Sequence, residues 1–464
     1  MSAFRNIWKI PELRARILFT LGLILLCRLI AVVPTPGLNP AGVSELADLL
    51  RSNAAQGGGL LGMADLFTGG ALANCAVGTL SIWPYINASI IIQLMTAIIP
   101  SLEKMAREGD VGRQKLTQTT RYLTLVLCAG QSFGIAKLLE HSQTTFGLQN
   151  PLVAWGGVGF EVLTVIAMTS ATMLVMWLGE QMTERGIGNG MSVIIMVNIC
   201  ARLPNALWQT ALKFRPVGGM PAQYGIIELA FLLLLAFFVF LVTILLTDGV
   251  RKVPLHTARG SVGGRVVGGQ STYLPLRVNY GGVMPIIFAG PILAVVGWLF
   301  FHIDAEKVPL LGWLQEYGRL LKEGYQHPSA SYLITYALLI VFFSFFWVAT
   351  QFNAVRIADD MKASNSYVPG IRPGMPTAEF LDLTMTRVTF IGAVGLVIIA
   401  LLPSILRGWG NGRMPAELAS FFGGTSLLII VGVALDTMRQ IESYLVMREY
   451  DGFLKHGRIR GRAG

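Results

Sequence analysis

Ten stretches of about 20 mainly apolar residues recur along the chain, and a helix of that length crosses the hydrocarbon core of a bilayer. These candidate spans are residues 17–36, 77–99, 121–139, 159–179, 190–210, 225–247, 281–303, 331–351, 386–406 and 418–438. Only 13% of the residues are charged, about half of the ~25% typical of a soluble domain, so most of the exterior must face lipid. We therefore predict an all-α integral membrane protein with ten transmembrane helices.

The ten candidate spans form two sets of five. We expect an N-terminal half over 1–210, a connecting hinge over 211–224, a C-terminal half over 225–438 and a cytoplasmic tail over 439–464. Because five is an odd number, the second half must be inverted relative to the first. Inverted repeats occur in many transporters, in which the transport path lies between the repeats.

The basic residues indicate the orientation in the membrane. Of the 36 Lys and Arg residues, 25 lie on the side that holds both termini and 10 lie on the opposite side. Because positive charge is enriched in cytoplasmic loops, we expect both termini in the cytoplasm. Arg28 is the one charge clearly within the membrane, toward the outer end of its span, where a functional role, structural pairing and snorkelling to the interface all fit it.

Two long segments on the predicted cytoplasmic side, 248–280 and 352–387, are dense in Gly, Pro and Arg. Such basic hairpins indicate docking of an acidic cytoplasmic partner, and contact with anionic lipid headgroups is the alternative. The stretch GGRVVGGQS (263–271) has the glycine spacing of a phosphate loop, but Gln270 stands where that loop needs Lys. We therefore predict a glycine-rich hairpin there and an external energy source for any uphill transport.

The sequence contains no constellation for catalysis or metal binding. An intramembrane aspartyl enzyme needs two buried carboxylates on facing helices, and a metalloprotease needs HExxH; neither pattern is found in this sequence. The four cysteines are isolated, without CxxC or Cys/His pairing. These patterns predict a protein that is not an enzyme and has no catalytic residue, cofactor or metal site.

Residues 57–75 predict a break in the helical pattern. Glycines 57–59 are expected to interrupt helical structure. The stretch GMADLFTGGALANC (62–75) that follows predicts a helix too short to span a bilayer. At membrane depth, broken helices are buried in protein or line a water-filled cavity; an outer-surface loop helix is the alternative. In the following helix, Ile82, Ile86 and Ile90 share one face, which is either lipid-facing or an apolar constriction that holds back water and ions.

Five long stretches, in order and spread over nearly the whole chain, resemble the SecY family, whose members form the channel of the protein translocase. They are WPYINASIIIQLMTAIIPSLEKMAREGDVGRQKLTQTTRYLTLV, GEQMTERGIGNGMSVII, GGQSTYLPLRVNYGGVMPIIFA, SYVPGIRPGMPTAEFLD and FFGGTSLLIIVGVALD. The resemblance implies ten transmembrane helices in two inverted five-helix halves around a central pore. This pore passes unfolded secretory polypeptides across the membrane and releases membrane segments laterally into lipid.

The same resemblance implies a multi-pass protein of the bacterial inner (plasma) membrane that is a passive pore without chemistry of its own. The implied partners are the SecE and SecG subunits, the SecA motor ATPase, the ribosome, signal-peptide-bearing precursor proteins, SecDF, YidC and membrane lipids.

The resemblance also assigns roles to residues of this sequence. The implied pore ring is Ile82, Ile86, Met191, Ile195, Ile287 and Ile429, with Met191 where isoleucine is usual in the family. The implied plug contains Met63, Ala64, Asp65, Leu66, Phe67, Thr68, Gly69 and Gly70. The implied lateral gate contains Gln93, Gln131 and Asn279. The implied partner-docking residues are Arg251, Lys252, Arg259, Arg265, Arg356 and Arg372.

Two other classes compete with a protein channel. A secondary transporter of a small solute needs polar or ionisable groups at the membrane midplane, where this sequence is rich in isoleucine. An intramembrane enzyme needs the catalytic pairs that the sequence lacks.

Overall fold

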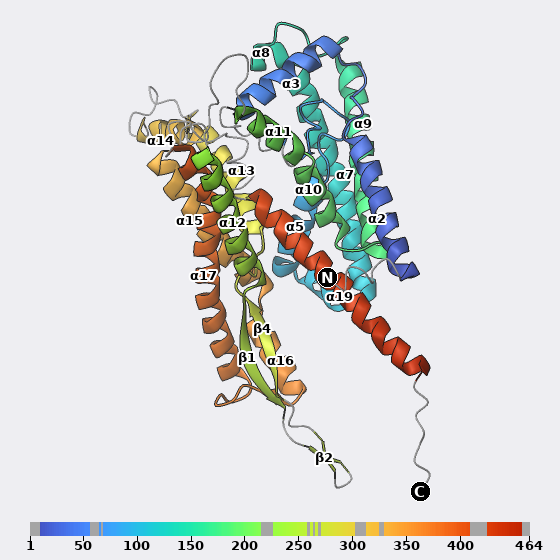
Figure 1. Ribbon diagram of the computed structural model, residues 1–464, viewed down its shortest axis with the longest axis vertical. Coiled ribbons are helices and arrows are strands. Elements are labelled where there is room, and N and C mark those ends of the chain that lie inside the picture. Colours follow the sequence, from blue (N-terminus) through green and yellow to red (C-terminus); the bar gives the residue numbers. More distant parts are fainter. Residues whose placement is uncertain are drawn as a thin grey trace. The chain divides into compact units, whose positions relative to one another are not determined.

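A computed structural model gives the fold, which is built mainly of helices (Figure 1). It describes residues 10–55, 65, 68–214, 226–257, 260–262, 265–267, 271–301, 312–323, 329–408 and 425–456. Within these residues, strands are confined to 250–277 and 366–367. Five of the residues assigned to the plug and the docking site lie outside the described part of the chain: Met63, Ala64, Leu66, Phe67 and Arg259.

Six helices of the described chain are long and apolar enough to cross a membrane, or up to seven if one bent pair is counted as a span. The six are α7 (Asp110–Glu140), α9 (Val158–Arg185), α12 (Ile226–Asp248), α13 (Met284–Phe301), α15 (Ala330–Gln351) and α17 (Met375–Gly408). Three further predicted spans correspond to α2 (Pro11–Ile30), α10 (Gly190–Cys200) and α19 (Thr425–His456). Because α10 has only 11 residues and the other two carry several charged residues, the count of ten spans stays a prediction.

Contacts divide the chain into two compact units. The first comprises Met1–Ala54, Leu61–Asn205 and Gly432–Gly464, and the second comprises Ala55–Leu60 and Ala206–Val431. Helix α19 therefore contributes its residues up to Val431 to the second unit and the rest to the first.

Proline positions explain where several helices of the first unit begin. The remaining helices that start in this unit are α3 (Pro40–Ala55), α5 (Trp83–Ile98), α6 (Pro100–Arg107), α8 (Ser142–Phe146) and α11 (Leu203–Lys213). Proline occupies the first turn of α2, α5 and α6, where its missing N–H is not needed. Ile99 has extended backbone because Pro100 follows it, so α5 ends there and α6 leaves at an angle of 104°.

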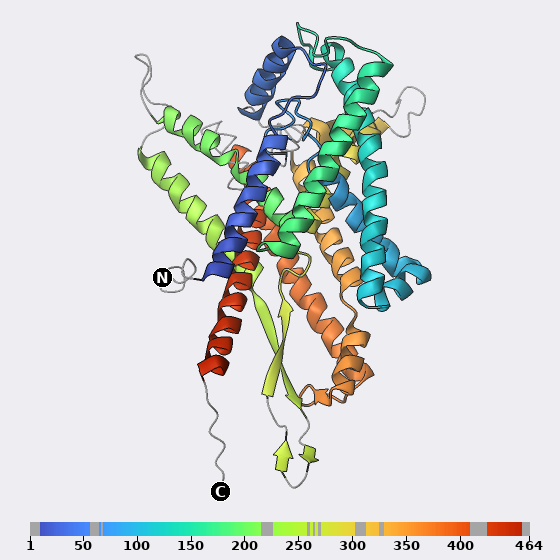
Figure 2. The same cartoon turned by 90° about the vertical axis from the view of Figure 1, so that its right-hand side faces the viewer.

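Helices α7 and α9 lie side by side (Figures 1 and 2) and are joined by ion pairs near both ends of α9. At one end, Arg121 binds both oxygens of the Glu180 carboxylate, at 2.9 and 2.8 Å. At the other end, the Lys137 Nζ atom lies 2.5 Å from Glu161 Oε1. From the first pair to the second, α7 has a buried face of small side chains that begins next to Arg121: Thr120, Thr124, Cys128, Ser132 and Ala136. Small residues let two helices approach closely, so this antiparallel pair is fixed along its length.

The second unit has an apolar core formed by α13, α14 (Gly312–Glu323), α15 and α17. Its most buried side chains, each at most 1% exposed, are Ile286, Leu293, Leu321, Ile340 and Leu396. These residues come from four different helices, so the core holds the four together.

The two long basic segments fold into one body, which we call the hairpin body (residues 250–277 and 352–385). Strands β1 (Val250–Thr257) and β4 (Ser271–Arg277) pair antiparallel, and β5 (Ser366–Tyr367) joins the other edge of β1. Helix α16 (Ala354–Ala363) lies beside this sheet (Figure 1). One apolar core takes side chains from both segments and from the start of α17: Val253, Leu255, Leu276, Met361, Val368, Leu381 and Met385. The two segments, predicted separately, therefore form one structural unit.

The glycine-rich stretch predicted as a hairpin contains strand β3. Strand β2 (Gly260–Val262) pairs antiparallel with β3 (Arg265–Val267), from Gly260 opposite Val267 to Val262 opposite Arg265. This pairing confirms the predicted hairpin in place of a phosphate loop.

Candidate channel constriction and plug seat

Four of the six predicted ring residues belong to one apolar cluster of the first unit. Ile82 precedes the first turn of α5 and Ile86 lies one turn further on, while Met191 and Ile195 lie one turn apart on α10. All four pack with buried side chains of α2, α9 and α10: Leu23, Cys27, Val175, Leu178, Met182, Val193 and Ile194. The sequence resemblance thus selected residues that the fold brings together, although they are more than 100 positions apart in the chain.

The isoleucine face of α5 is turned into the protein. Ile82 is 2% exposed and Ile90 is 5% exposed, whereas Ile91, one residue further on, is 39% exposed. The lipid-facing interpretation of this face is therefore wrong for Ile82 and Ile90. In the second unit, Ile287 on α13 and Ile429 on α19 are buried too.

The segment before α5 is more compact than the predicted short helix. Asp65 and Thr68 have helical backbone, but residues 69–75 form turns. Gly69 and Gly70 both have positive φ, at +66° and +94°, which interrupts a right-handed helix. The expected helix over 62–75 therefore does not extend beyond Thr68. The turns that follow are buried, with Ala71, Ala73, Cys75 and Ala76 each at most 5% exposed.

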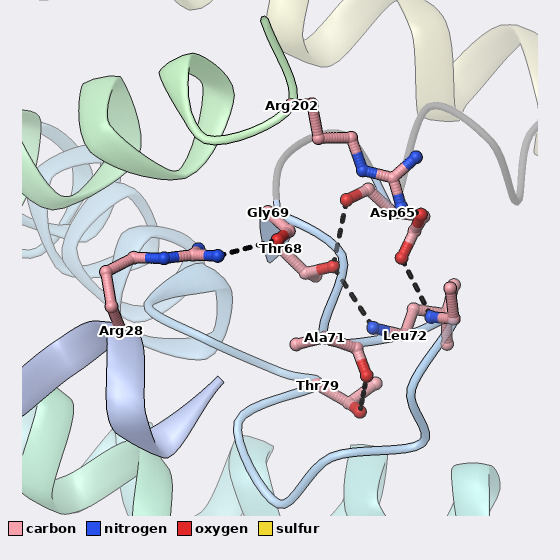
Figure 3. A network of polar contacts seen from close by, with 9 residues as sticks. Arg28, Asp65, Thr68, Gly69, Ala71, Leu72, Thr79 and Arg202 are labelled. Carbon is pink, nitrogen blue, oxygen red and sulfur yellow. Dashed lines mark hydrogen bonds and ion pairs between the residues drawn. The ribbon is translucent and has the colours of Figure 1, made fainter. Parts of the chain in front are cut away.

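Asp65 is the centre of a polar network that holds this segment (Figure 3). Its carboxylate forms an ion pair with Arg202, beyond the end of α10, and accepts the Ala73 N–H at 2.9 Å. The Thr68 hydroxyl donates to the Asp65 carbonyl at 3.1 Å and accepts the Leu72 N–H at 3.4 Å. Because Asp65 is only 1% exposed, its charge depends on these partners.

Arg28 is the second anchor, and its place inside a span is explained by structural pairing. Its Nη2 atom donates to the Gly69 carbonyl at 3.1 Å (Figure 3). Its Nη1 atom donates to Asn198 Oδ1 at 3.3 Å. Asn198 in turn donates to the Ser81 hydroxyl at 3.0 Å. The buried amide of Asn198 therefore links α2, α10 and the entry to α5.

Residues just after α2 also hold this segment, through hydrogen bonds to its backbone. Thr35 donates from both its N–H and its hydroxyl to the Cys75 carbonyl, at 3.0 and 2.8 Å. The Val77 N–H donates to the Val33 carbonyl at 2.9 Å. The Thr79 hydroxyl donates to the Ala71 carbonyl at 3.2 Å (Figure 3). We call residues 65–79 with their partners Arg28, Asn198 and Arg202 the plug seat.

The sequence analysis did not identify the roles of Asn198 and Arg202. Both lie within the predicted span 190–210, where they interrupt an otherwise mainly apolar stretch. A polar residue within an apolar stretch carries a desolvation cost unless it is paired. The positions of Asn198 and Arg202 therefore indicate that each has a polar partner in the fold. What the sequence lacked was the partner, because Asp65 lies 137 positions earlier.

The three predicted lateral-gate residues are not joined to one another by hydrogen bonds in the described structure. Gln93 is exposed on α5, and Asn279 is half-buried just after β4. Gln131 is half-buried on α7, with its Oε1 atom buried and without a hydrogen-bond partner. Their gate role stays a prediction.

The predicted docking residues of the second unit belong to the hairpin body or to its tip. Arg251 and Lys252 are exposed on β1, and the Lys252 ammonium lies 4.8 Å from the centre of the Tyr273 ring. Arg356 is exposed on α16, and Arg265 begins β3. Arg372 is exposed between two turns, where its carbonyl accepts the Thr377 hydroxyl at 2.8 Å. The shared core thus presents basic groups of both segments on one body.

Comparison with known proteins gives a consistent result. A family model described as SecY matches residues 76–438. The protein translocase subunit SecY of Chlamydia trachomatis serovar D is 41% identical, with 100% of each chain covered. The SecY subunit of Thermotoga maritima is 40% identical, with 99% of each chain covered.

Solved structures of protein-conducting channels have the same fold. A protein-conducting channel matches with a TM-score of 0.53 at 15% identity, covering 93% of this chain and 92% of that one. A SecY structure described by the role of its plug domain in stabilising the closed channel matches with a TM-score of 0.56 at 17% identity and the same coverage. Canine Sec61 in a ribosome–channel complex matches with a TM-score of 0.55 at 14% identity, covering 93% and 92%.

Proposed function

This chain belongs to the SecY family, and on that premise we propose which of its residues seal the channel, hold the plug and bind partners. The protein is a multi-pass membrane protein and the channel-forming subunit of a protein translocase. Its family consists of protein-conducting channels and not of classical enzymes. A small-solute transporter has no support from these relatives.

The proposed seal is the apolar ring of Ile82, Ile86, Met191, Ile195, Ile287 and Ile429. Branched apolar side chains exclude water from a narrow passage, and they offer a passing polypeptide no hydrogen bonds that would retain it. Support comes from the cluster that contains the first four residues and from the burial of the other two. Met191, which is flexible, fills space in the ring without a polar group.

The proposed plug is the segment that contains residues 63–70, held in the closed position by its contacts with the rest of the plug seat. The observation that carries this proposal is the double anchoring of the segment by Arg28 and by Arg202, close in sequence to the ring residue Ile82. Two cations on a short buried segment give it a defined resting position. The same contacts are few and polar, so water and an incoming polypeptide can replace them when the channel opens.

The hairpin body is the proposed docking site for the SecA motor ATPase or the ribosome. Arg251, Lys252, Arg259, Arg265, Arg356 and Arg372 supply its positive charge. A guanidinium group binds carboxylate and phosphate in a forked geometry, so arginine suits both an acidic protein and ribosomal RNA. The relatives' role as translocase subunits supports SecE and SecG as further partners, with signal-peptide-bearing precursors as the transported substrate.

The proposed orientation places both termini in the cytoplasm of a bacterial cell, with the protein in the inner membrane. The distribution of Lys and Arg, 25 on one side against 10 on the other, supports this orientation. Gln93, Gln131 and Asn279 are proposed to line the lateral exit into lipid, where signal sequences and membrane segments leave the channel.

The test of the channel path is site-specific photo-crosslinking with a secretory precursor stalled during translocation. A photoreactive residue at Ile86 or Ile287 is expected to crosslink to the precursor. The matched control is Ile91, which is on the same helix as Ile86 but is 39% exposed. Crosslinks at Ile91 but not at Ile86 would contradict the proposed path.

A further inference from the structure

The turn between α9 and α10 has its backbone N–H groups bound by side chains from three helices. The Ile187 N–H donates to Thr20 Oγ1 of α2 at 3.2 Å. The Gly188 N–H donates to Gln440 Oε1 of α19, and the Gly190 N–H donates to Thr183 Oγ1 of α9 at 2.9 Å. The Met191 N–H is capped by Asn189 Oδ1 at 3.1 Å.

This turn is buried and has little room to shift. Gly186, Ile187, Gly188 and Gly190 are all buried. A Cβ atom on Gly190 would lie 2.0 Å from the carbonyl oxygen of Gly179, so α9 and α10 meet backbone to backbone. Gly188 has a φ of +85°, which glycine tolerates. A buried N–H that loses its acceptor is costly, so each of the three helices contributes to holding the turn.

The turn leads directly into two proposed ring residues. Met191 is the second residue of α10, and Ile195 follows one turn later. The hydrogen bonds of an α-helix hold its residues in a regular arrangement, so a rotation of the first turn of α10 rotates the side chains that follow it as well. The hydrogen bonds of the turn therefore fix the direction in which Met191 and Ile195 point.

Helix α19 is itself held firmly against the start of the chain. Ile441 and Leu445 pack on Leu13 and Ile187 in one apolar cluster. Arg16 donates to the Tyr444 hydroxyl at 3.2 Å, and its guanidinium lies 5.0 Å from the centre of that ring. Gln440 directly precedes Ile441 on this helix, so these contacts keep its amide at the turn.

We infer that Gln440 is a positioning residue of the channel seal: by binding Gly188 it fixes the start of α10 and thus the place of Met191 and Ile195 in the ring. The inference rests on the proposed ring. Helix α19 also carries the proposed ring residue Ile429, 11 residues before Gln440 in the sequence.

The test uses the assembled translocase in proteoliposomes and measures ion leak through the closed channel. Gln440→Met keeps the length of the side chain but removes the acceptor, and we expect the leak to rise by about tenfold, the change that 1.4 kcal/mol produces. Gln440→Glu keeps an acceptor oxygen and is expected to restore the wild-type leak. Glu442→Met is the matched control, because Glu442 is an exposed residue of the same helix.

Ile195→Asn is included as a direct test of the ring. If Ile195→Asn leaks while Gln440→Met does not, the positioning role of Gln440 is overturned and the ring stands. If neither variant leaks, the ring assignment fails and the role of Gln440 fails with it. A leak in Gln440→Met that Gln440→Glu does not reduce would also overturn the inference. Thermal unfolding of each purified complex, expected to show that every variant is still folded at the assay temperature, separates a seal defect from a folding defect.

Discussion

Asp65 and Arg202 form an ion pair in which the carboxylate is almost wholly buried and the guanidinium is about one-third exposed. The pair joins the proposed plug to the end of α10, the helix that carries two proposed ring residues. A buried carboxylate without a cation is strongly disfavoured, so the position of Asp65 depends on Arg202. Displacement of the plug therefore requires the pair to separate and both charges to find water or new partners.

Asp65→Asn isolates the contribution of this ion pair, because the amide oxygen can still accept the Ala73 N–H. Removing one partner of a buried pair costs about 3–5 kcal/mol, and we expect the lower end of that range because the Arg202 side chain is 30% exposed. The closed state should be weakened, with a higher ion leak and more export of precursors with defective signal sequences. Asp65→Ala, which also loses the Ala73 contact, should have the larger effect. Equal, wild-type leak in both variants would contradict a role in closure.

Gly69→Ala is predicted to disturb the plug seat sterically. A Cβ atom at this position would lie 2.4 Å from Arg28 Nη1 and 3.0 Å from the Asn198 backbone. Gly147→Ala is the matched control: its φ of +68° is nearly the same as the +66° of Gly69, but no atom lies within 4 Å of the added Cβ. Both variants pay the backbone strain of about 1–2 kcal/mol, and only Gly69→Ala should increase ion leak. Similar leak from the two variants would mean that strain alone explains the effect.

Arg372→Glu is predicted to abolish motor-driven translocation while protein level and helix content stay near wild type. Arg372 is exposed, so an ion pair within its own loop would contribute only about 0–1 kcal/mol to folding. A desolvated contact with a partner carboxylate or phosphate is worth about 2–5 kcal/mol of binding. Arg372→Lys should be partly active, because an ammonium group cannot form a forked contact.

The measurement is precursor translocation into vesicles matched for channel content, with motor binding assayed in parallel. Lys362→Glu is the control, since Lys362 is an exposed cation of the same hairpin body outside the proposed docking set. Normal translocation by Arg372→Glu would remove this residue from the docking site.

Glu45 provides a pH-dependent contact outside the membrane spans. Its carboxylate accepts the N–H groups of Gln149 and Asn150 at 2.7 and 3.0 Å, and these hydrogen bonds lower the pKa of Glu45 below its ordinary value. A lowered pKa in the folded state means that the contact stabilises above the ordinary pKa. This stabilisation is lost as the pH falls through the lowered value.

The check is amide hydrogen exchange at Gln149 and Asn150 in wild type and in Glu45→Gln, compared at equal pH. At pH 7 exchange should be faster in the variant, because an uncharged amide oxygen is the weaker acceptor. At a pH below the lowered pKa the two proteins should converge. A difference that stayed constant over this range would exclude the carboxylate as its cause.

Apolar spans were predictable because bilayer thickness fixes the length of a spanning helix: α13 follows its predicted range closely, as do the start of α9 and the end of α7. The ends of helices were less predictable. α17 starts at Met375, 11 residues before the expected span, because its first turns pack in the hairpin body through Leu381 and Met385. A hydropathy profile detects apolar stretches that can enter a bilayer, and it does not detect helical turns that pack against a domain outside the bilayer.

Contacts between distant polar residues could not be predicted at all. Asp65 and Arg202 look like ordinary charges in sequence, and Asn198 looks like a defect in a span. The pairing of β5 with β1 rests on two residues, Ser366 and Tyr367, which carry no strand pattern of their own. The ring residues of the first unit were identified through family resemblance, since an isoleucine repeat alone fits lipid as well as a constriction.

The single core of the hairpin body has a mechanical consequence. β1 and β4 continue from α12 and lead into α13, while α16 and β5 connect α15 to α17. A partner that binds the hairpin body and pushes a polypeptide inward applies force to this core. The core transmits that force to the ends of four helices, α12, α13, α15 and α17. Because residues 250–277 and 352–385 share this core, a partner that binds only one of the two segments displaces both, and with them the ends of all four helices.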